Sequence, residues 1–303
     1  MKKISETIIF FGSGPVAAKS LEAIAKKFAI ELVITKPKPQ HHKQPFPVIE
    51  TAKNLHLQIL TTKDKQDLVG KLKDYPLSSR LGLVIDYGII VPKDIIERFD
   101  LGIINSHFSL LPKYRGADPI SYAILNGDRY SGVSLMQIVP ALDEGPLLAQ
   151  AKLQLNQQET SSSLTDRLIK LSNQLIEETL PKYLSGDIKT RPQPKQNVSY
   201  SHKLDKQDSV LDWSKPAVYL ERQVRAFQDW PRSRTMIGKI PVIVTKAHVV
   251  QGKDIPGKIY LKDKQLGFYT QKDLFIIDEL MPEGKKLMSA SAFLNGYKID
   301  TDN

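Results

Sequence analysis

Short apolar runs alternate with helical patterns through the first half of the chain. Four runs have the length and composition of buried strands: TIIFF (7–11), IELVIT (30–35), LGLVID (81–86) and LGIIN (101–105). Apolar positions recur at helical spacing over residues 16–28 and 63–75, and Leu164, Leu168, Leu171 and Leu175 form one apolar stripe. Strand–helix alternation of this kind favours an α/β fold with a doubly wound, mostly parallel sheet.

The pattern changes near residue 184. Residues 184–203 lack apolar periodicity and carry two prolines, so we expect a linker there. A helical pattern over about 217–227 then precedes short strand-like runs at 240–250, 257–261, 266–270 and 273–280. Strands at this spacing predict a small β-barrel. We therefore expect three parts: a first domain (1–183), a linker (184–203) and a second domain (204–303).

Composition narrows the class of protein. A length of 303 residues suggests two domains, and 41% apolar residues suffice for their cores. No apolar run approaches the length of a membrane span, and the apolar region near the N-terminus is too short for a signal peptide. The chain has no cysteine, which excludes disulfides, thiolate metal sites and cysteine nucleophiles. We expect a cytoplasmic protein without a membrane partner, and a monomer.

The net charge of +10 is uneven along the chain. From Leu204 onward there are 16 Lys/Arg and 13 Asp/Glu, so most of the excess lies earlier. One cationic cluster follows the second predicted strand and another lies in the predicted linker, and they include Lys36, Lys38, Lys43, Lys189, Arg191 and Lys195. A polyanionic partner would explain this charge, and so would a lysine-rich surface; charge alone leaves both open.

The first strand-to-helix turn, GSGPVA (12–17), fits the glycine pattern of a dinucleotide site. In such a site the second strand ends in an acidic residue that binds the ribose. Here the second strand ends VITKPKP, with Lys36 and no acid nearby. We therefore reject a nicotinamide or flavin site and expect a tight turn that packs or touches substrate.

A polar pair ends the fourth predicted strand. Asn105 and His107 stand two residues apart, so a strand places both on one face. Ligands of parallel sheets bind beyond such strand ends. An amide and a protonated imidazole could both donate hydrogen bonds to the oxyanion of an acyl transfer. If the substrate supplies an amine, no nucleophilic side chain is required.

Asp143 lies in the turn PALDEGPLL (140–148) and could be the partner of His107. A neighbouring carboxylate favours the protonated imidazole and can relay a proton from an attacking amine. Taken singly, His107 could be a structural histidine and Asp143 a turn-capping acid. The histidines show no metal-ligand spacing, so we expect no metal. We assign His41 and His42, in a lysine-rich loop, to the surface or to a phosphate.

Residues 105–148 resemble the core of the folate-dependent formyltransferases. The family pattern is Asn-x-His-x-Ser-Leu-Leu-Pro, then Arg-Gly, then Leu-Asp-x-Gly, and the spacing fits throughout. The resemblance implies that Asn105, His107 and Asp143 are catalytic. It also implies folate contacts from two segments, which comprise Ser109, Leu110, Leu111, Pro112, Asp86, Tyr87 and Gly88.

The resemblance continues past the linker. Residues 203–233, 256–261 and 283–297 are similar to the second domain of the family members that formylate methionyl-tRNA. This implies an OB-like second domain that binds tRNA, 10-formyltetrahydrofolate as donor, and the α-amine of initiator methionyl-tRNA as acceptor. No DNA partner is implied. The two cationic clusters defined above would then contact the tRNA.

Two other functions compete with this interpretation. Enzymes that formylate amino-sugar nucleotides carry a related second domain, but a small nucleotide needs no extended cationic track. A nucleic-acid-binding protein with an inactive fold would not need the Asn–His–Asp set. The chain also departs from the family at Asp86, where a small apolar residue is usual, in the GSGPVAA turn, and in the shorter basic loop TKPKPQHHKQPFP (35–47).

Overall fold

A computed structural model describes residues 4–39 and 46–299. The chain forms two compact units. The first unit holds residues up to 116 together with 131–153 and 165–200, and the second holds 117–130, 154–164 and the chain from 201 onward. The chain therefore passes between the units several times. The domain boundaries expected from the sequence stay a prediction.

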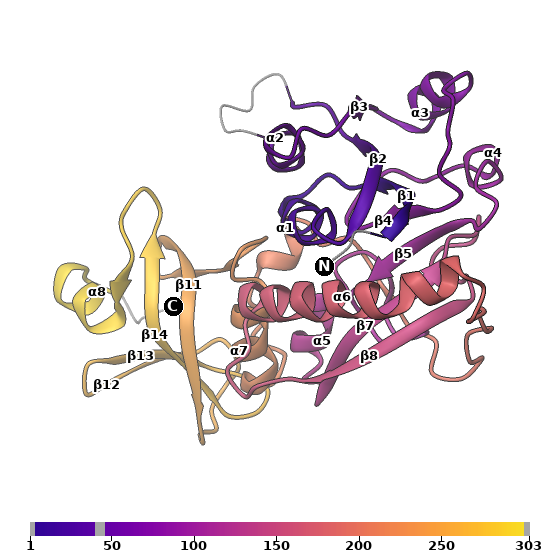
Figure 1. Cartoon of the computed structure of the whole chain (residues 1–303). Coiled ribbons are helices and arrows are strands. Elements are labelled where there is room, and N and C mark those ends of the chain that lie inside the picture. The colour runs from indigo at the N-terminus through magenta and orange to yellow at the C-terminus, as the bar shows by residue number, and fades with distance from the viewer. Residues whose placement is uncertain (1–3, 40–45, 300–303) are drawn as a thin grey trace. The chain divides into compact units, whose positions relative to one another are not determined.

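The first unit is built on a seven-stranded sheet in the order β3-β2-β1-β4-β5-β7-β8 (Figure 1). Strands β3, β2, β1, β4 and β5 run parallel, and β7 is antiparallel to β5. This sheet confirms the predicted mostly parallel α/β class. In chain order its strands are β1 (Ile4–Phe11), β2 (Phe28–Thr35), β3 (Ile59–Thr61), β4 (Gly82–Val84), β5 (Ile103–His107), β7 (Tyr130–Gln137) and β8 (Leu147–Gln154).

Helices cover both faces of this sheet. Helices α3 (Lys65–Leu72) and α4 (Lys93–Ile96) pack against the side chains of odd-numbered residues in β1 and β5, such as Phe11 and Ile103. Even-numbered Ser106 of β5 points to the other face, where its hydroxyl lies 2.7 Å from that of Ser172 in a long helix. Three more helices belong wholly or mostly to this unit: α1 (Pro15–Ile24), α2 (Pro47–Asn54) and α6 (Ser161–Leu184).

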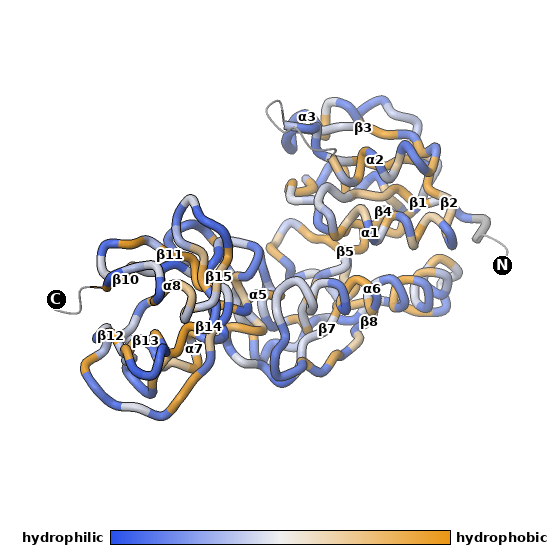
Figure 2. Tube along the Cα trace, turned by 90° about the vertical axis from the view of Figure 1, so that its left-hand side faces the viewer, coloured by the Kyte–Doolittle hydropathy of each residue, from blue (hydrophilic) through white to orange (hydrophobic). Residues whose placement is uncertain are grey.

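The core explains why these segments form this sheet. Residues 8–11 of β1 are completely buried, as expected for a central parallel strand that is covered on both faces. In α6, the predicted stripe is largely confirmed because Leu164, Leu168 and Leu175 are buried. Figure 2 shows the resulting mixture of hydrophobic and hydrophilic positions along this helix. None of the helices within residues 4–39 and 46–299 is long and apolar enough to cross a membrane.

The second unit contains an antiparallel sheet in the order β10-β11-β14-β13-β12, with β15 paired to β14. This antiparallel sheet confirms the predicted β class of the C-terminal domain. The order of its hydrogen-bonded strands runs from β10 at one end to β12 at the other. Trp213 stacks on Phe268 over the core, and helices α5, α7 and α8 belong to this unit. The elements are α5 (Pro119–Leu125), α7 (Ala217–Ala226), β10 (Ser233–Ile237), β11 (Ile240–Val250), β12 (Ile259–Lys262), β13 (Gln265–Tyr269), β14 (Leu274–Pro282), β15 (Met288–Ser289) and α8 (Ala290–Gly296).

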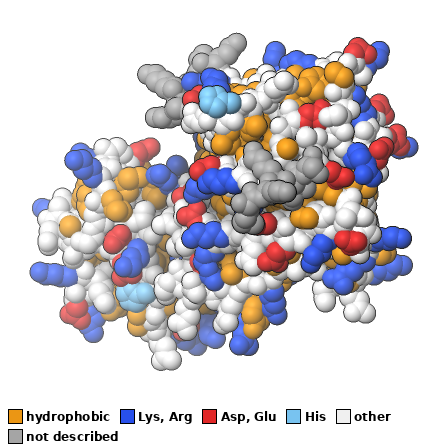
Figure 3. Space-filling model, viewed as in Figure 1, with side chains coloured by type: hydrophobic (Ala, Val, Ile, Leu, Met, Phe, Trp, Pro, Cys, Tyr) orange, Lys and Arg blue, Asp and Glu red, His pale blue; other side chains and the backbone are white. Residues whose placement is uncertain are grey.

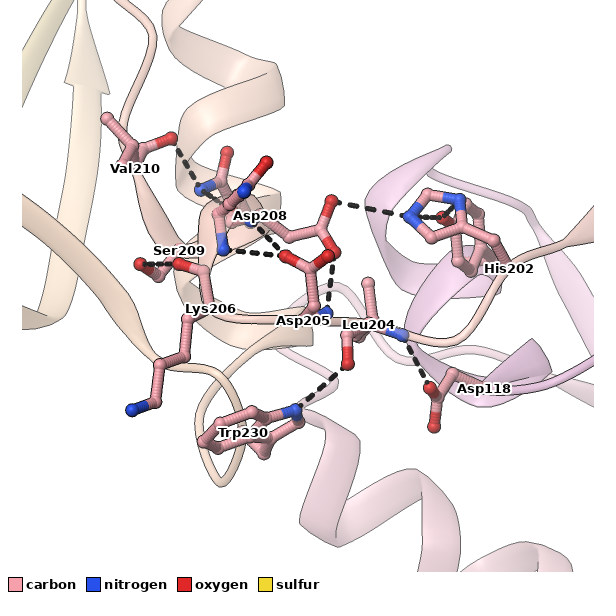
Figure 4. Close-up of polar contacts among 12 residues, drawn as sticks. Asp118, His202, Leu204, Asp205, Lys206, Asp208, Ser209, Val210 and Trp230 are labelled. Atoms are coloured by element: carbon pink, nitrogen blue, oxygen red, sulfur yellow. Dashed lines mark hydrogen bonds and ion pairs between the residues drawn. The ribbon is translucent and has the colours of Figure 1, made fainter.

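The segment 202–210 is tied to the second unit by polar contacts (Figure 4). The backbone N–H of Leu204 donates to Asp118 at 2.9 Å, and the indole N–H of Trp230 donates to the carbonyl of Leu204 at 3.1 Å. Asp208 accepts from the backbone N–H of Asp205 at 2.8 Å, beside a short 3-10 turn (Gln207–Ser209). The segment that directly follows the predicted linker is therefore ordered by hydrogen bonds, which leave no periodic apolar pattern.

Two very short strands complete the description. β6 (Arg115–Gly116) pairs with β9 (Tyr200–Ser201) in a two-stranded ribbon. The backbone N–H of Arg115 donates to the carbonyl of Ser199 at 2.9 Å. Further upstream, Leu147 of β8 and Arg191 exchange two backbone hydrogen bonds of 2.7 and 2.8 Å. Much of the predicted linker thus runs as extended chain along the first unit.

Candidate active site

Loops after β1, β2 and β4 meet at the carboxyl edge of the parallel sheet. The backbone N–H of Ser13 donates to the carbonyl of Asp86 at 3.0 Å, and that of Lys36 donates to the hydroxyl of Ser13 at 3.2 Å. A Cβ on Gly14 would lie 2.0 Å from the Asp86 carboxylate, so glycine leaves room for that side chain. The GSGPVA turn therefore packs against the loop after β4, which is the role expected for it.

Asn105 lies in the middle of β5, between the neighbouring strands β4 and β7, and opposite the last residue of β4. It pairs in register with Val84 on one side and Met136 on the other. Its side chain is partly exposed and, within residues 4–39 and 46–299, makes no hydrogen bond. An amide held by a central strand with its polar atoms unused is well placed to bind a ligand.

His107 shares the face of Asn105 and is buried, with 7% of its surface exposed. Its Nε2 lies 2.8 Å from the backbone carbonyl of Tyr114. A carbonyl only accepts hydrogen bonds, so Nε2 carries a proton. The other ring nitrogen, Nδ1, lies 3.8 Å from Oδ2 of Asp143. A distance of 3.8 Å is too long for a direct hydrogen bond between Nδ1 and Oδ2. It allows a polar group of a substrate to form hydrogen bonds with both atoms at once.

The turn that carries Asp143 is tightly packed. Asp143 has a φ of 49°, in the left-handed region, and its Oδ2 accepts a 2.7 Å hydrogen bond from the backbone N–H of Gly116. A Cβ on Gly145 would lie only 1.7 Å from the carbonyl oxygen of Gln137. The structure thus brings Asp143 to His107, as the sequence predicted.

Gln193 contacts this turn, and the sequence pattern predicts no role for it. Its side-chain amide donates to the carbonyls of Asp143 and Gly145, and its side-chain oxygen accepts from Arg115. The segment of Gln193 has no apolar period, so the sequence predicts only a linker there. The one available signal was its position between Pro192 and Pro194, two residues that restrict the backbone to extended conformations.

The segment 109–112 is fixed by internal hydrogen bonds. The Ser109 hydroxyl donates to the carbonyl of Lys113 at 2.6 Å, and the side chain of Ser109 is almost fully buried. Leu111 donates its N–H to the hydroxyl of Ser134 at 3.0 Å and accepts from Gln150 at 2.9 Å. Leu111 and Pro112 are buried and Leu110 is partly exposed, so this segment would shape a folate site chiefly through its backbone and its packing.

The loop 86–88 has two exposed residues around a buried one. Asp86 and Gly88 are exposed and have φ values of 48° and 67°. Tyr87 is 2% exposed; its hydroxyl lies 2.6 Å from that of Thr62, and burial raises the pKa of Tyr87 to about 12. Tyr87 therefore belongs to the core, whereas Asp86 and Gly88 lie at the surface.

The predicted tRNA-contacting cations differ in position. Lys36 places its Nζ beside Gly88, since a Cβ there would lie 2.8 Å from it, whereas Lys38 is exposed. Lys43, like His41 and His42, lies outside the described residues. The linker cations are all exposed: Lys189, Arg191 and Lys195. On the face shown in Figure 3, Lys and Arg are spread over the surface among Asp and Glu.

No metal centre is evident in the part of the chain that the structure describes. No group of three or more His, Asp and Glu side chains is arranged there to hold an ion. The candidate site is therefore an unpaired amide, a buried histidine and a carboxylate at the carboxyl edge of a parallel sheet. Such a set can bind an anionic oxygen and move a proton.

The comparisons with known proteins identify the family of the chain. Residues 6–180 match the sequence model of the formyl transferases, and residues 203–298 match that of the formyl transferase C-terminal domain. The chain belongs to the formyl transferase family, whose members use folate-derived formyl donors.

The similar curated proteins are named methionyl-tRNA formyltransferase. The relative from Myxococcus xanthus is 36% identical over 96% of this chain and 95% of its own length. The relative from Thermodesulfovibrio yellowstonii is 35% identical, with 98% of each chain covered.

Solved structures show the same fold at greater distance. An N-formyltransferase from Helicobacter canadensis, in complex with folinic acid and dTDP-3-aminofucose, has a TM-score of 0.69 and 19% identity, covering 90% of this chain and 99% of its own. HypX from Aquifex aeolicus, in complex with tetrahydrofolic acid, has a TM-score of 0.65 and 16% identity, covering 97% of this chain and 48% of its own.

Proposed function

We propose that this chain transfers the formyl group of 10-formyltetrahydrofolate to the α-amino group of initiator methionyl-tRNA. One observation carries the proposal: relatives named methionyl-tRNA formyltransferase are similar over both predicted domains, with 36% identity over 299 residues. The matched ranges 6–180 and 203–298 fall within the proposed catalytic domain (1–183) and, apart from residue 203, the proposed tRNA-binding domain (204–303). We place the reaction in the cytoplasm and the enzyme as a monomer.

The site geometry suggests the part that each side chain plays. The amine attacks the formyl carbon, and the carbonyl electrons move to the oxygen. Asn105 donates one hydrogen bond to this oxyanion. A protonated Nδ1 of His107 donates a second, because Nε2 is held by the carbonyl of Tyr114. Asp143, 3.8 Å from Nδ1, balances the charge of the imidazolium.

The second half of the reaction breaks the bond between the formyl carbon and N10 of the folate. The attacking nitrogen must lose a proton, and N10 must gain one as tetrahydrofolate leaves. Asp143 can accept the first proton, directly or through a group that bridges it to His107, and can return it to N10. The electrons of the oxyanion then re-form the carbonyl, and the C–N10 bond breaks. The proposed steps involve these three side chains and no metal.

The donor would bind between the loop 86–88 and the segment 109–112. Asp86 and Gly88 are exposed there, and the unpaired amide of Asn105 lies on β5, which neighbours β4, the strand before that loop. Ser109, Leu110, Leu111 and Pro112 would form a pre-organised wall, since Ser134 and Gln150 already fix their backbone. Tyr87 would support this loop from the core.

The cationic clusters would hold the acceptor. Lys36 is partly exposed and lies beside the loop 86–88, and Lys38, two residues later, is exposed. With Lys43 and the linker residues Lys189, Arg191 and Lys195, they offer phosphate contacts along the route to the site. Such contacts give affinity without base specificity.

The direct test is the identity of the product. The purified chain is incubated with 10-formyltetrahydrofolate carrying a labelled formyl group and with charged initiator tRNA. After deacylation, we expect the label in N-formylmethionine. Uncharged tRNA is the matched control, because it offers the same phosphates without the amine. Absence of N-formylmethionine, with a folded protein and an intact donor, would refute the proposed function.

A further inference from the structure

The side chain of Gln193 links the Asp143 turn to Arg115. Its Nε2 donates to the carbonyl of Asp143 at 2.7 Å and to that of Gly145 at 2.8 Å. Its Oε1 accepts from Nη2 of Arg115 at 2.9 Å and from Nε at 3.3 Å. Both donor hydrogens and the acceptor oxygen of the amide are thus in use.

Arg115 holds the same turn at a second point. Its Nη1 lies 2.8 Å from Oε1 of Glu144, and its side chain is 9% exposed. The next residue, Gly116, donates its backbone N–H to the carboxylate of Asp143. Residues 143, 144 and 145 are therefore each fixed by Gln193 or by the pair 115–116. Charge-assisted contacts of this kind are geometrically specific.

The turn is crowded, so its conformation depends on the contacts around it. Asp143 has a left-handed backbone, which Asp adopts more readily than most residues with a side chain but still less readily than glycine. Leu142 is 60% exposed, so no hydrophobic anchor holds that side of the turn. Gly145 is pressed against the backbone of β7. Polar contacts to the carbonyls on both sides of Glu144 therefore decide where the Asp143 carboxylate lies.

The backbone of Gln193 is itself well fixed. Pro192 and Pro194 restrict its conformation. Two residues upstream, Arg191 exchanges two backbone hydrogen bonds with Leu147. The amide is thus presented from a rigid extended segment, as a supporting contact requires.

We infer that Gln193 is a positioning residue of the formyl transfer, which sets the location of the Asp143 carboxylate relative to His107. The inference rests on the proposed function, because it gives Asp143 a part in proton transfer. Gln193 contacts Asp143 only through the backbone carbonyl, so it acts through Asp143. Removing its two N–H donors should let the turn shift and lower turnover, with little change in the affinity for the donor.

The test compares Gln193→Glu, Gln193→Met and the matched control Gln196→Glu. The Glu variant keeps the acceptor for Arg115 and removes both N–H donors, and the Met variant keeps the length with neither function. Gln196 is an exposed neighbour in the same segment. We expect kcat of both Gln193 variants to fall roughly 10- to 100-fold, the scale of a displacement near 1 Å, with KM for the donor unchanged within about twofold. Gln196→Glu should match the wild type.

A purely structural role is distinguished by two further readouts. In an Asp143→Asn background, Gln193→Glu should add no further loss of kcat, because it acts through Asp143. The pH profile of kcat should also change for Gln193→Glu and not for Gln196→Glu. Equal losses of kcat in both backgrounds, with an unchanged profile, would overturn the inference. So would normal turnover in both Gln193 variants. A wild-type protein that does not formylate methionyl-tRNA would instead refute the proposed function, and this result is distinct from the outcomes above.

Discussion

Asn105 lies on a central strand, and its side-chain amide makes no hydrogen bond within the described part of the chain. The surrounding residues leave it no structural partner, while Ser106, its neighbour on the opposite face, is paired with Ser172. At the residue scale, this contrast distinguishes the Asn105 amide, which can bind a ligand, from the Ser106 hydroxyl, which stabilises the fold. The same reasoning applies to Nδ1 of His107, whose partner nitrogen is already bound.

Replacing Asn105 by Ala should lower turnover and leave binding nearly intact. The loss of one oxyanion donor costs about 3–4 kcal/mol of transition-state stabilisation, which corresponds to roughly 100- to 1,000-fold in kcat. Steady-state kinetics with both substrates measure the effect, and Asn54→Ala, on the exposed side of α2, is the matched control. An increase in KM at unchanged kcat would assign Asn105 to substrate binding.

Asp143→Asn tests the carboxylate without changing the shape of the side chain. Asn tolerates the left-handed backbone and can still accept the hydrogen bond from Gly116, so the turn should keep its conformation. We expect kcat to fall by about 100-fold or more, since acid–base assistance is lost. Donor affinity, measured by titration calorimetry, should change little. A variant with near-normal turnover would remove Asp143 from the mechanism.

The sequence predicts that Asn105 and His107 share one face of a strand and that Asp143 is the partner of His107, but not which contacts hold these residues. Residue type and spacing mark an amide, an imidazole and a carboxylate as polar groups near strand ends. The contact from His107 to Tyr114 uses a backbone carbonyl, which every residue has, so no side chain could reveal it. The contacts of Gln193 cannot be predicted from the sequence for a related reason. They depend on the course of the backbone through a segment that has no apolar period.

At the scale of elements, the apolar pattern predicts which residues are buried better than it predicts which residues pair in a strand. The run 81–86 predicted one strand, but β4 ends at Val84, although Ile85 is fully buried. The early end lets the chain turn at Asp86 and expose the loop beside the site. Conversely, residues 184–203 have no apolar period and are nevertheless ordered by backbone and side-chain hydrogen bonds. Polar order of that kind leaves no periodic trace in a sequence.

Glu31 of β2 gives a prediction at this scale, because it ties the strand to the loop before β4. Its carboxylate accepts from the backbone N–H groups of Ser78 and Ser79 at 3.0 and 2.7 Å, and from the Ser78 hydroxyl at 2.8 Å. Burial works against the charge, yet the hydrogen bonds from Ser79 and Ser78 prevail and lower the pKa of Glu31 below its ordinary 4.5.

The consequence is a pH-dependent loss of stability. A depressed pKa in the folded state stabilises the fold above the unfolded pKa, near 4.5, and this contribution disappears as the pH falls through the folded value. Glu31→Gln should therefore lower the free energy of unfolding by about 1 kcal/mol at pH 7 and by less at pH 3 to 4. Urea unfolding measures this, with the exposed Glu22→Gln as control. A difference that does not shrink on acidification would contradict the assignment.

At the scale of the whole molecule, the excess positive charge would bind phosphates if the acceptor is a tRNA. Most of it lies before residue 204, and the exposed cations near the site and in the linker belong to that part. A nucleotide-linked sugar presents too few phosphates to use such a distribution. On the face that Figure 3 shows, Lys and Arg are interspersed with Asp and Glu.

A salt titration tests whether these lysines bind tRNA. Affinity for tRNA should fall with salt, with a log–log slope of about 0.7–0.9 per phosphate contact. The triple variant Lys36→Ala, Lys38→Ala, Lys43→Ala should flatten this slope and weaken tRNA use. The control removes Lys26, Lys53 and Lys93, each of which lies near a glutamate on its own helix or next to it. An unchanged slope with unchanged tRNA kinetics would mean that the three loop lysines are solvated surface.

The competition between two acceptors tests the central claim most directly. The chain is given 10-formyltetrahydrofolate with charged initiator tRNA and an amino-sugar nucleotide together, at equal concentrations, and the two formylated products are quantified. The account predicts that N-formylmethionyl-tRNA carries nearly all of the transferred formyl group. Preferential formylation of the amino sugar would contradict it, and would show that the Asn105–His107–Asp143 site serves a small nucleotide acceptor.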